Sequence, residues 1–302
     1  MRVFVTGSTG FVGSAVVQEL ISHDHQVLGL ARNEAGAKSL AEAGAEIQRG
    51  GLQDLDSLRA GAGASDGVLH LGFIHDFSRF KEVCEIDRLA IEAIAAELAG
   101  SDRPLIVTSG TALVKPGFLA TEEDESTIDP SAFPRVLSER ATVAAAEKGL
   151  RASIVRLSPS VHGDGDHGFV PILIALAREK GVSAYVGEGL NRWTAVHRLD
   201  SAQLYRLALE KGAAGARYHG VAEEGIPFRE IAEAIGRGLN LPVVSKSPEE
   251  AAEHFGWFAH FAAIDCPASS ELTRERLGWN PTHVGLIADL DHGTYFTGGN
   301  SR

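Results

Sequence analysis

The sequence has little of what marks secreted, membrane-spanning or nucleic-acid-binding proteins. Only two cysteines, Cys84 and Cys266, occur among 302 residues, which argues against a disulfide scaffold and favours a reducing, cytoplasmic location. No apolar run approaches the roughly 20 residues needed to cross a bilayer, and no signal-peptide pattern follows Met1. The net charge of −12 argues against nucleic acid or an anionic membrane as the main partner. We therefore expect an enzyme or sensor that acts on a small molecule.

The first half of the chain alternates short apolar runs with helical patterns. Apolar runs with little polar alternation, such as Gln26 to Ala31, are typical of strands buried on both faces of a parallel sheet. Strand and helix in alternation predict an α/β fold with a Rossmann-type, doubly wound parallel sheet. The helical patterns cover residues 11–23, 34–43, 54–60, 80–98, 136–148, 169–180, 200–211 and 227–239.

The second half is less regular and predicts a smaller, C-terminal substrate lobe. We expect residues 1–165 to form the dinucleotide-binding domain, completed by about 194–222. Residues 166–193 and 223–302 would then form the smaller lobe. Asp200 or Ser201 is the expected N-cap of the helix that ends at Lys211.

The strongest motif is the glycine-rich stretch "VTGSTGFVGSAVV", between the first predicted strand and the first predicted helix. Gly7 allows a tight turn, Gly10 lets backbone N–H groups approach a pyrophosphate, and Gly13 allows close packing of helix on sheet. The helix N-terminus adds free N–H donors and partial positive charge. The predicted cofactor-binding residues of this turn are Gly7, Ser8, Thr9, Gly10, Phe11, Val12 and Gly13.

The end of the second strand decides between NAD and NADP. A carboxylate at this place would bind the ribose 2′-hydroxyl of NAD. The sequence instead has Arg32 and Asn33, and a guanidinium there can pair with a 2′-phosphate. We therefore predict NADP (NADPH) as the cofactor.

These features, with "VLHLGF", "IVTSG", "RLSPSVHGDG" and "NRWTAVHRLD" in the expected order, resemble the extended and atypical short-chain dehydrogenase/reductase superfamily, often labelled NAD-dependent epimerase/dehydratase. The resemblance covers nearly the whole chain. It implies an active-site serine or threonine after the fifth strand and a substrate pocket at the second lobe. It adds further cofactor positions at Leu71, Gly72, Pro159, Ser160 and Val161.

The catalytic Tyr-x-x-x-Lys pair of that superfamily is missing from this sequence. The best alignment, "RVLSE", places Arg135 on the tyrosine and Glu139 on the lysine. Arginine does not release a proton near neutral pH, but it can stabilise an oxyanion or hold a carboxylate. Four residues apart on a helix, Arg135 and Glu139 are expected to pair, either at a functional site or as a plain surface salt bridge.

The hydroxyl group and the proton donor are also displaced from the family pattern. Ser109 and Thr111 flank the place of the family's hydroxyl, which Gly110 occupies, and either could contact a carbonyl or merely cap the strand. Histidine titrates in the useful pH range. His75, oriented by Asp76, is our first choice as proton donor, and the alternatives, which are also candidate substrate contacts, are His162 and His167.

Three further expectations concern the second lobe and the surface. Arg192 and Trp193 resemble residues that line the family's substrate pocket, or else they pack beneath the second lobe. "HGDGDHG" offers metal ligands, but its glycines favour a connecting loop, so we predict no metal site. The resemblance makes a homodimer through the helices near 80–98 and 136–148 plausible.

Three functions are compatible with this pattern. The first is an NADP(H)-dependent oxidoreductase that reduces a small carbonyl or related unsaturated compound with a non-standard proton donor. The second is a non-catalytic regulator that senses NADP. The third is an epimerase or dehydratase that recycles its cofactor internally.

Overall fold

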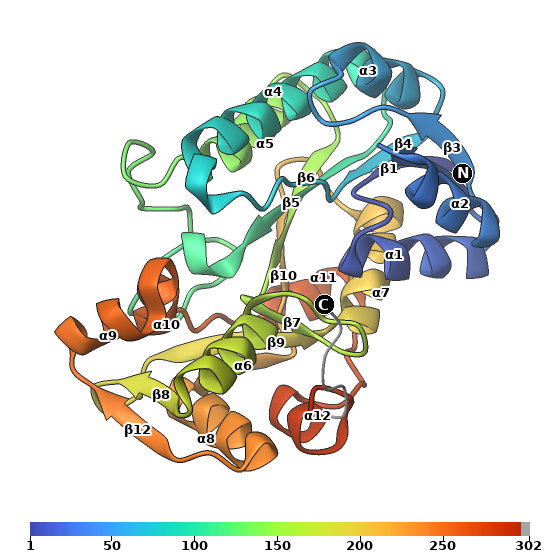
Figure 1. Ribbon diagram of the computed structural model, residues 1–302. Coiled ribbons are helices and arrows are strands. Elements are labelled where there is room, and N and C mark those ends of the chain that lie inside the picture. The colour runs from blue at the N-terminus through green and yellow to red at the C-terminus, as the bar shows by residue number, and fades with distance from the viewer. Residues whose placement is uncertain (297–302) are drawn as a thin grey trace.

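The computed structural model describes residues 1–296 and shows a large α/β part with a smaller lobe packed below it (Figure 1). A parallel sheet lies between two helix layers, and the smaller lobe sits at the carboxyl ends of its strands. The predicted Rossmann-type fold with a smaller C-terminal lobe is confirmed.

The large sheet has seven parallel strands in the order β10-β6-β5-β4-β1-β2-β3. Because the chain extends one way from β1 to β3 and the other way from β4 onward, the strand order reverses between β1 and β4. In open α/β sheets ligands bind at the carboxyl ends of the strands beside such a reversal. The strands are β1 (Arg2–Thr6), β2 (Gln26–Ala31), β3 (Glu46–Arg49), β4 (Gly67–His70), β5 (Leu105–Gly110), β6 (Ala152–Leu157) and β10 (Arg217–Gly220).

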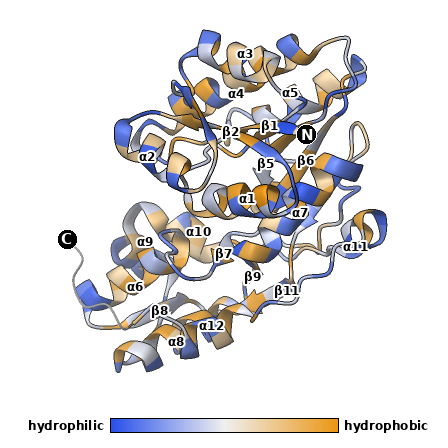
Figure 2. Ribbon diagram, turned by 90° about the vertical axis from the view of Figure 1, so that its right-hand side faces the viewer, coloured by the Kyte–Doolittle hydropathy of each residue, from blue (hydrophilic) through white to orange (hydrophobic). Residues whose placement is uncertain are grey.

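Two apolar cores hold the helices against this sheet, one on each face. Figure 2 shows the hydrophobic colour along the central strands and on the helix sides turned toward them. The helices on one face are α1 (Phe11–Ser22), α2 (Glu34–Glu42) and α7 (Arg198–Lys211), and those on the other are α3 (Leu55–Gly63), α4 (Phe80–Leu98) and α5 (Val136–Glu147).

The smaller lobe has a core of its own, formed by side chains of its helices and of two short sheets. Its strands are β7 (Ser160–His162), β9 (Arg192–His197) and β11 (Glu223–Pro227) in one sheet, and β8 (Ser183–Val186) and β12 (Val243–Lys246) in the other. The remaining helices are α6 (Phe169–Lys180), α8 (Phe228–Leu239), α9 (Pro248–Phe255), α10 (Ala259–Ala263), α11 (Glu271–Leu277) and α12 (Leu286–His292). Short 3₁₀ turns are η1 (Phe77–Arg79), η2 (Thr111–Leu113) and η3 (Gly256–Phe258).

One predicted helix cap is wrong. The side chain of His197, not of Asp200 or Ser201, accepts a hydrogen bond at the start of α7, from the backbone N–H of Leu199 at 3.3 Å. The Asp200 carboxylate instead contacts the segment before α12, where it accepts hydrogen bonds from the backbone N–H groups of Thr282 and His283. A long-range tertiary contact therefore replaces the local cap.

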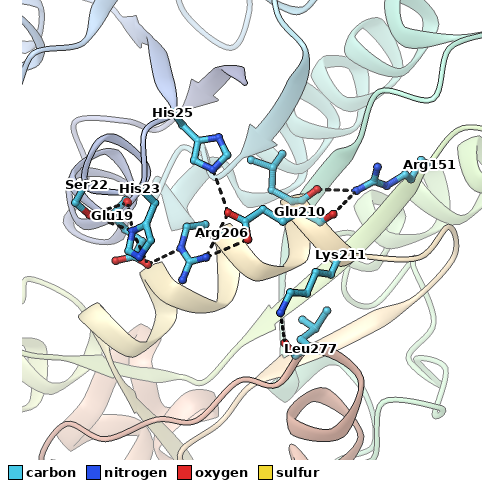
Figure 3. A network of polar contacts seen from close by, with 10 residues as sticks. Glu19, Ser22, His23, His25, Arg151, Arg206, Glu210, Lys211 and Leu277 are labelled. Atoms are coloured by element: carbon cyan, nitrogen blue, oxygen red, sulfur yellow. Dashed lines mark hydrogen bonds and ion pairs between the residues drawn. The ribbon is translucent and has the colours of Figure 1, made fainter.

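Polar contacts fix α7 against α1, as Figure 3 shows. Arg206 of α7 donates to Glu19 of α1 at 2.7 Å and to Glu210 at 3.0 Å. His25 meets Glu210 at 3.1 Å. Since α7 follows directly from β9 of the smaller lobe, these contacts tie the helix that leaves that lobe to α1 of the large part. None of the helices within residues 1–296 is both long and apolar enough to span a membrane.

Candidate functional site

The glycine-rich turn joins β1 to α1 as predicted, and its glycines are required by geometry. Gly7 has φ +66°, and a Cβ atom there would lie 2.7 Å from the backbone nitrogen of Gly72. A Cβ atom on Gly13 would lie 2.0 Å from the carbonyl oxygen of Gly7. Gly10 is the N-cap of α1 and offers no capping side chain, so first-turn N–H groups stay available to a phosphate.

The side chains around the turn have distinct positions. The Ser8 hydroxyl is buried and donates to the Leu30 carbonyl at 3.0 Å, whereas Thr9 is exposed. Phe11 and Val12 are half-buried at the start of α1. Ser8 therefore braces the turn against β2, and the turn's outer side is open to a ligand.

Leu71 and Gly72 follow β4 and lie against the turn. The backbone N–H of Leu71 donates to the Thr6 carbonyl, and that of Gly72 donates to Thr6 Oγ1 at 3.0 Å. Pro159, Ser160 and Val161 follow β6 at the same edge of the sheet. The Ser160 hydroxyl is buried with no hydrogen-bond partner among the described residues.

Arg32 stands at the end of β2, exposed and without a hydrogen bond or ion pair within residues 1–296. The neighbouring polar groups are occupied: Asn33 caps α2, and Glu34 pairs with Arg49 at 2.8 Å. A free guanidinium on the far side of the glycine-rich turn fits an adenosine 2′-phosphate. The residues present therefore fit a dinucleotide with that group.

Arg198, which sequence reasoning missed, extends this site from the start of α7. Its guanidinium lies 4.7 Å from the ring centre of Phe11 and donates to Ser14 Oγ of α1 at 3.2 Å. Its Nε is buried and has no partner among the described residues. Burial lowers the pKa of Arg198 below its ordinary value. A cation thus stands beside the N-terminus of α1, where the phosphates of a dinucleotide would lie.

Arg135 begins α5 but does not pair with Glu139, so the predicted helix-face salt bridge is wrong. The Arg135 Nη1 donates to Asp87 Oδ2 at 2.6 Å, and its Nη2 donates to the Thr108 carbonyl at 2.9 Å. The guanidinium also covers the ring of Phe73 at 4.4 Å. Only 12% of the Arg135 side chain is exposed, so it is held at the site rather than on the surface.

Asp87, on α4, links Arg135 to the glycine-rich turn. Its other carboxylate oxygen contacts His70 Nε2 at 3.1 Å, and His70 Nδ1 contacts Thr6 Oγ1 at 3.0 Å. Burial alone would raise the pKa of Asp87, but Arg135, His70 and Ser138 outweigh it and hold the pKa below its ordinary value. The carboxylate is therefore ionised and fixes the guanidinium in place.

Glu139 faces away from the site, which corrects its predicted catalytic place. It forms a two-bond ion pair with Arg156 of β6, with distances of 2.9 and 2.8 Å. Burial would raise the pKa of Glu139, but the Arg156 guanidinium lowers it below the ordinary value. Both side chains are buried, so the pair belongs to the interior between α5 and the sheet.

The hydroxyl groups after β5 are also occupied or buried. Thr111 is buried and meets Thr194 Oγ1 at 3.0 Å, and the buried Ser109 hydroxyl has no partner among the described residues. Thr108, which sequence reasoning missed, contacts Tyr205 Oη at 2.7 Å. Position 110 has room for a side chain, since a Cβ atom on Gly110 would lie 3.7 Å from its nearest neighbour.

Of the three candidate histidines, His75 and His167 lie at the site. His75 is solvent-accessible at the edge of the Phe73 ring, 5.3 Å away between centres. Asp76 does not orient it, because its carboxylate accepts from Ser78 instead. Partial desolvation by the surrounding protein lowers the pKa of His75, and the charges of Arg135 and His167 lower it further. His167 is exposed, with its ring 5.8 Å from that of Phe11.

The prediction that His162 is a proton donor or a substrate contact is wrong. It is fully buried, and its Nδ1 lies 2.7 Å from Asp289 Oδ2 of α12. The ring packs at 5.4 Å against that of His197, which stacks on His283. This histidine joins β7 to α12 inside the smaller lobe.

The two predicted pocket residues of β9 have different positions. Trp193 is fully buried, donates to the Phe261 carbonyl at 3.2 Å and packs on Phe228, so it is a core residue rather than a substrate contact. Arg192 is partly exposed, and Asp265 pairs with it at 2.9 Å. No group of three potential metal ligands occurs within residues 1–296.

Comparison with known proteins gives relatives along the whole chain. An uncharacterized protein of Schizosaccharomyces pombe is 52% identical, over 98% of this chain and 100% of its own length. The 2-alkyl-3-oxoalkanoate reductase of Stenotrophomonas maltophilia is 28% identical, over 82% of this chain and 78% of its own. The structure of the dTDP-glucose 4,6-dehydratase DesIV of Streptomyces venezuelae superposes with a TM-score of 0.78 at 19% identity, covering 98% and 96% of the two chains. The model of the NAD dependent epimerase/dehydratase family matches residues 3–221, and the chain therefore belongs to this family.

Proposed function

We propose that the protein is an NADP(H)-dependent oxidoreductase that reduces a small carbonyl or related unsaturated compound. The observation that carries the proposal is the position of Arg135, which Asp87 fixes at the sheet edge where the glycine-rich turn also lies. The reductase relative from Stenotrophomonas maltophilia, an enzyme named for a 3-oxo acid substrate, supports reduction of a carbonyl group.

The cofactor would be held by the backbone N–H donors of Phe11 to Gly13, since that of Gly10 already donates to the Gly7 carbonyl, and by two arginines. Arg198 would face the pyrophosphate and Arg32 the 2′-phosphate. When bound, the nicotinamide supplies a hydride to the substrate or accepts one from it. Leu71 and Gly72, which lie against the turn, would border the same cofactor.

Arg135 would stabilise the oxygen on which negative charge develops. A guanidinium has five N–H donors, and two of the Arg135 nitrogens each make a single hydrogen bond to protein. Donors therefore remain for a substrate oxygen, and the ion pair with Asp87 keeps them oriented before the reaction begins. Arginine contributes no proton, because its pKa lies far above neutrality.

His75 would deliver the proton, either directly or through water. Its lowered pKa keeps the ring mostly neutral at pH 7. The protonated fraction grows as the pH falls, so carbonyl reduction would accelerate toward acid pH until His75 is fully protonated. Glu139, Ser109 and Thr111 would have structural roles, because all three side chains are buried.

The test is NADPH oxidation with a panel of ketones, imines and enones, using Arg135→Lys and Arg135→Ala. Loss of one oriented donor costs roughly 10²–10³-fold in turnover at comparable enzyme sites. We expect a loss of that size for Arg135→Ala, with NADPH affinity by calorimetry unchanged. Arg140→Ala, on the exposed side of the same helix, is the matched control. Equal activity of Arg135→Ala and Arg140→Ala would refute the role of Arg135.

The family match favours one alternative, epimerisation or dehydration with an internally recycled cofactor. That chemistry would leave tightly bound cofactor on the purified protein and consume no NADPH. Stoichiometric NADPH oxidation in the panel excludes it, and product formation without NADPH oxidation supports it.

A further inference from the structure

An aromatic cluster joins the β4–α4 connection to the smaller lobe. We call its rings the aromatic wall: Phe77, Phe80, Phe133, Trp257 and Phe261. Phe77 stacks on Trp257 with centres 4.8 Å apart and meets Phe261 at 5.8 Å. Phe80 lies 5.9 Å from Phe77 and 4.8 Å from Phe133. Rings from η1, α4 and the loop before α5 thus meet rings from η3 and α10.

The aromatic wall extends from the proposed reaction centre. The Arg135 guanidinium covers Phe73, Phe73 meets His75 at 5.3 Å, and His75 meets Phe77 at 6.4 Å between ring centres. A substrate whose oxygen contacts Arg135 would therefore meet aromatic faces along its body.

The exposure of Trp257 sets it apart from the other tryptophans. The chain has three tryptophans, and Trp193 and Trp279 are exposed by 0% and 1%. Trp257 is 54% exposed although it stacks on Phe77. A large, accessible apolar surface next to convergent polar groups is typical of a small-molecule site rather than of a folding core.

The arginines nearby are already paired with carboxylates. Arg135 pairs with Asp87, Arg192 pairs with Asp265, and Arg79 of η1 pairs with Glu82. A substrate that carries phosphates would need free cations in this region, since burying an unpaired anion is costly. His75 and His260 also lie beside these rings, and the lowered pKa of His75 favours its neutral form. Lys81, next to Phe80 on α4, is the one nearby cation without an ion pair among the described residues, and it is exposed to solvent.

We propose that the substrate is an uncharged carbonyl compound with an aromatic or alicyclic body, which lies on the aromatic wall with its oxygen at Arg135. This assignment of substrate class rests on the proposed function. It excludes nucleotide-sugars as substrates, although members of the same family act on them, such as the UDP-glucose 4-epimerase of Streptomyces lividans.

The test uses Trp257 as a reporter that does not require turnover. Because the other two tryptophans are buried, acrylamide quenching of the full-length protein with NADP⁺ bound reports mainly on Trp257. Three probes are compared: the bicyclic ketone β-tetralone, dihydroxyacetone and UDP-glucose. We expect β-tetralone alone to protect the fluorescence from acrylamide, with a saturation curve that gives its dissociation constant.

Kinetic variants complete the test. We expect Trp257→Ala and Phe77→Ala to raise the Michaelis constant for β-tetralone about tenfold or more, with a smaller change in the turnover number. Phe118→Ala is the control, because Phe118 is 65% exposed and lies outside the aromatic wall. Protection by UDP-glucose, or equal effects of Trp257→Ala and Phe118→Ala, would overturn the substrate class.

The outcomes separate this inference from the proposed function. Protection by β-tetralone without NADPH oxidation supports the aromatic site and refutes the reductase. Reduction of β-tetralone with a Michaelis constant unaffected by Trp257→Ala and Phe77→Ala supports the reductase and refutes the aromatic site.

Discussion

The Arg135 guanidinium at the start of α5 and the Asp87 carboxylate in the middle of α4 form an ion pair of 2.6 Å. Asp87 is 1% exposed and Arg135 12%, so water screens the pair poorly. Residues from two helices and from β4 thereby hold one guanidinium at the proposed reaction centre. The pair also joins the packing of α4 and α5 to the chemistry proposed for Arg135.

This ion pair makes Arg135 important for stability as well as for the proposed activity. Arg135→Ala would leave the Asp87 charge buried with only His70 and Ser138 as partners. Removing one partner of a buried pair costs about 3–5 kcal/mol, and we expect a loss toward the lower limit because those two contacts remain. Urea unfolding measures it, with Arg140→Ala as the control, expected within about 0.5 kcal/mol of the parent. Identical midpoints for the two variants would contradict the prediction.

Local patterns allowed most of the large sheet to be predicted, but not the ion pairs. The bounds of α4, α6 and β2 agree with the expected ranges, because periodic apolar positions and short apolar runs are local signals. The predicted Arg135–Glu139 pair does not form, because an exposed pair four residues apart on a helix contributes only about 0.3–0.5 kcal/mol to stability. Arg135 and Glu139 instead form ion pairs with the buried partners Asp87 and Arg156, which come from distant segments.

The smaller lobe was harder to predict for the same reason. Strands β7, β11 and β12 are three to five residues long and are defined by pairing with distant segments. The burial of His162 depends on α12, more than 120 residues away in the chain. The place of Arg198 depends on the packing of α7 on α1. No local pattern carries this information.

The ion pair of Glu139 and Arg156 gives a second prediction. Glu139→Gln would leave the fully buried Arg156 without its carboxylate, at a cost of about 3–5 kcal/mol. The double variant Glu139→Met with Arg156→Met removes both charges and should recover most of that loss, because apolar groups can replace a buried pair at little cost. Denaturant unfolding of Glu139→Met, Arg156→Met and the double variant forms a double-mutant cycle, and simple additivity of the two single losses would refute the pair's coupling.

Arg32 is predicted to select the phosphorylated cofactor. Arg32→Ala should weaken NADP⁺ binding by about 10–100-fold, since a charge-assisted hydrogen bond contributes about 1.5–3 kcal/mol. The affinity for NAD⁺ should stay constant, because that cofactor has no 2′-phosphate. Isothermal titration calorimetry measures both affinities. Arg49→Ala, whose side chain already pairs with Glu34, serves as the control on the adjacent strand. An equal loss of affinity for both cofactors would exclude a role specific to the 2′-phosphate.

Arg198 should behave differently, because the pyrophosphate is common to both cofactors. Arg198→Ala should weaken NADP⁺ and NAD⁺ alike, by about tenfold or more. Arg198→Lys keeps the charge but loses the planar contact with Phe11, so it should recover part of the affinity. Calorimetry at two salt concentrations checks the result, since a contact between charges weakens with salt. A larger loss of affinity for one cofactor than for the other would show that Arg198 does not act through the shared pyrophosphate.

His219 is predicted to make stability depend on pH in a defined window. It is fully buried on β10, with Nδ1 at 2.7 Å from the Ser269 carbonyl and Nε2 at 3.3 Å from Arg156 Nη1. Burial and the Arg156 charge lower the pKa of His219 to about 4, whereas the unfolded chain has the ordinary value of 6.5. Between these values the unfolded state binds the proton more readily, so stability rises with pH. The contribution of His219 is complete above pH 6.5 and is lost as the pH falls toward 4.

The size of this effect follows from the shift, at about 1.4 kcal/mol per pKa unit, and is on the order of 3 kcal/mol. The carboxylates with lowered pKa values, Asp87 and Glu139, lose their contributions at lower pH, below the ordinary values of 3.8 and 4.5. Urea unfolding between about pH 4.5 and 7 therefore avoids most of the loss from these two carboxylates. Because burial also lowers the pKa values of His75, His197 and His254, the His219 contribution is the difference between the parent and a variant that cannot titrate at this position. His219→Gln keeps a donor for Ser269 and an acceptor for Arg156 but does not titrate, so its stability should fall less over this range. Parallel pH profiles of the variant and the parent would show that His219 binds its proton equally well in the folded and the unfolded chain.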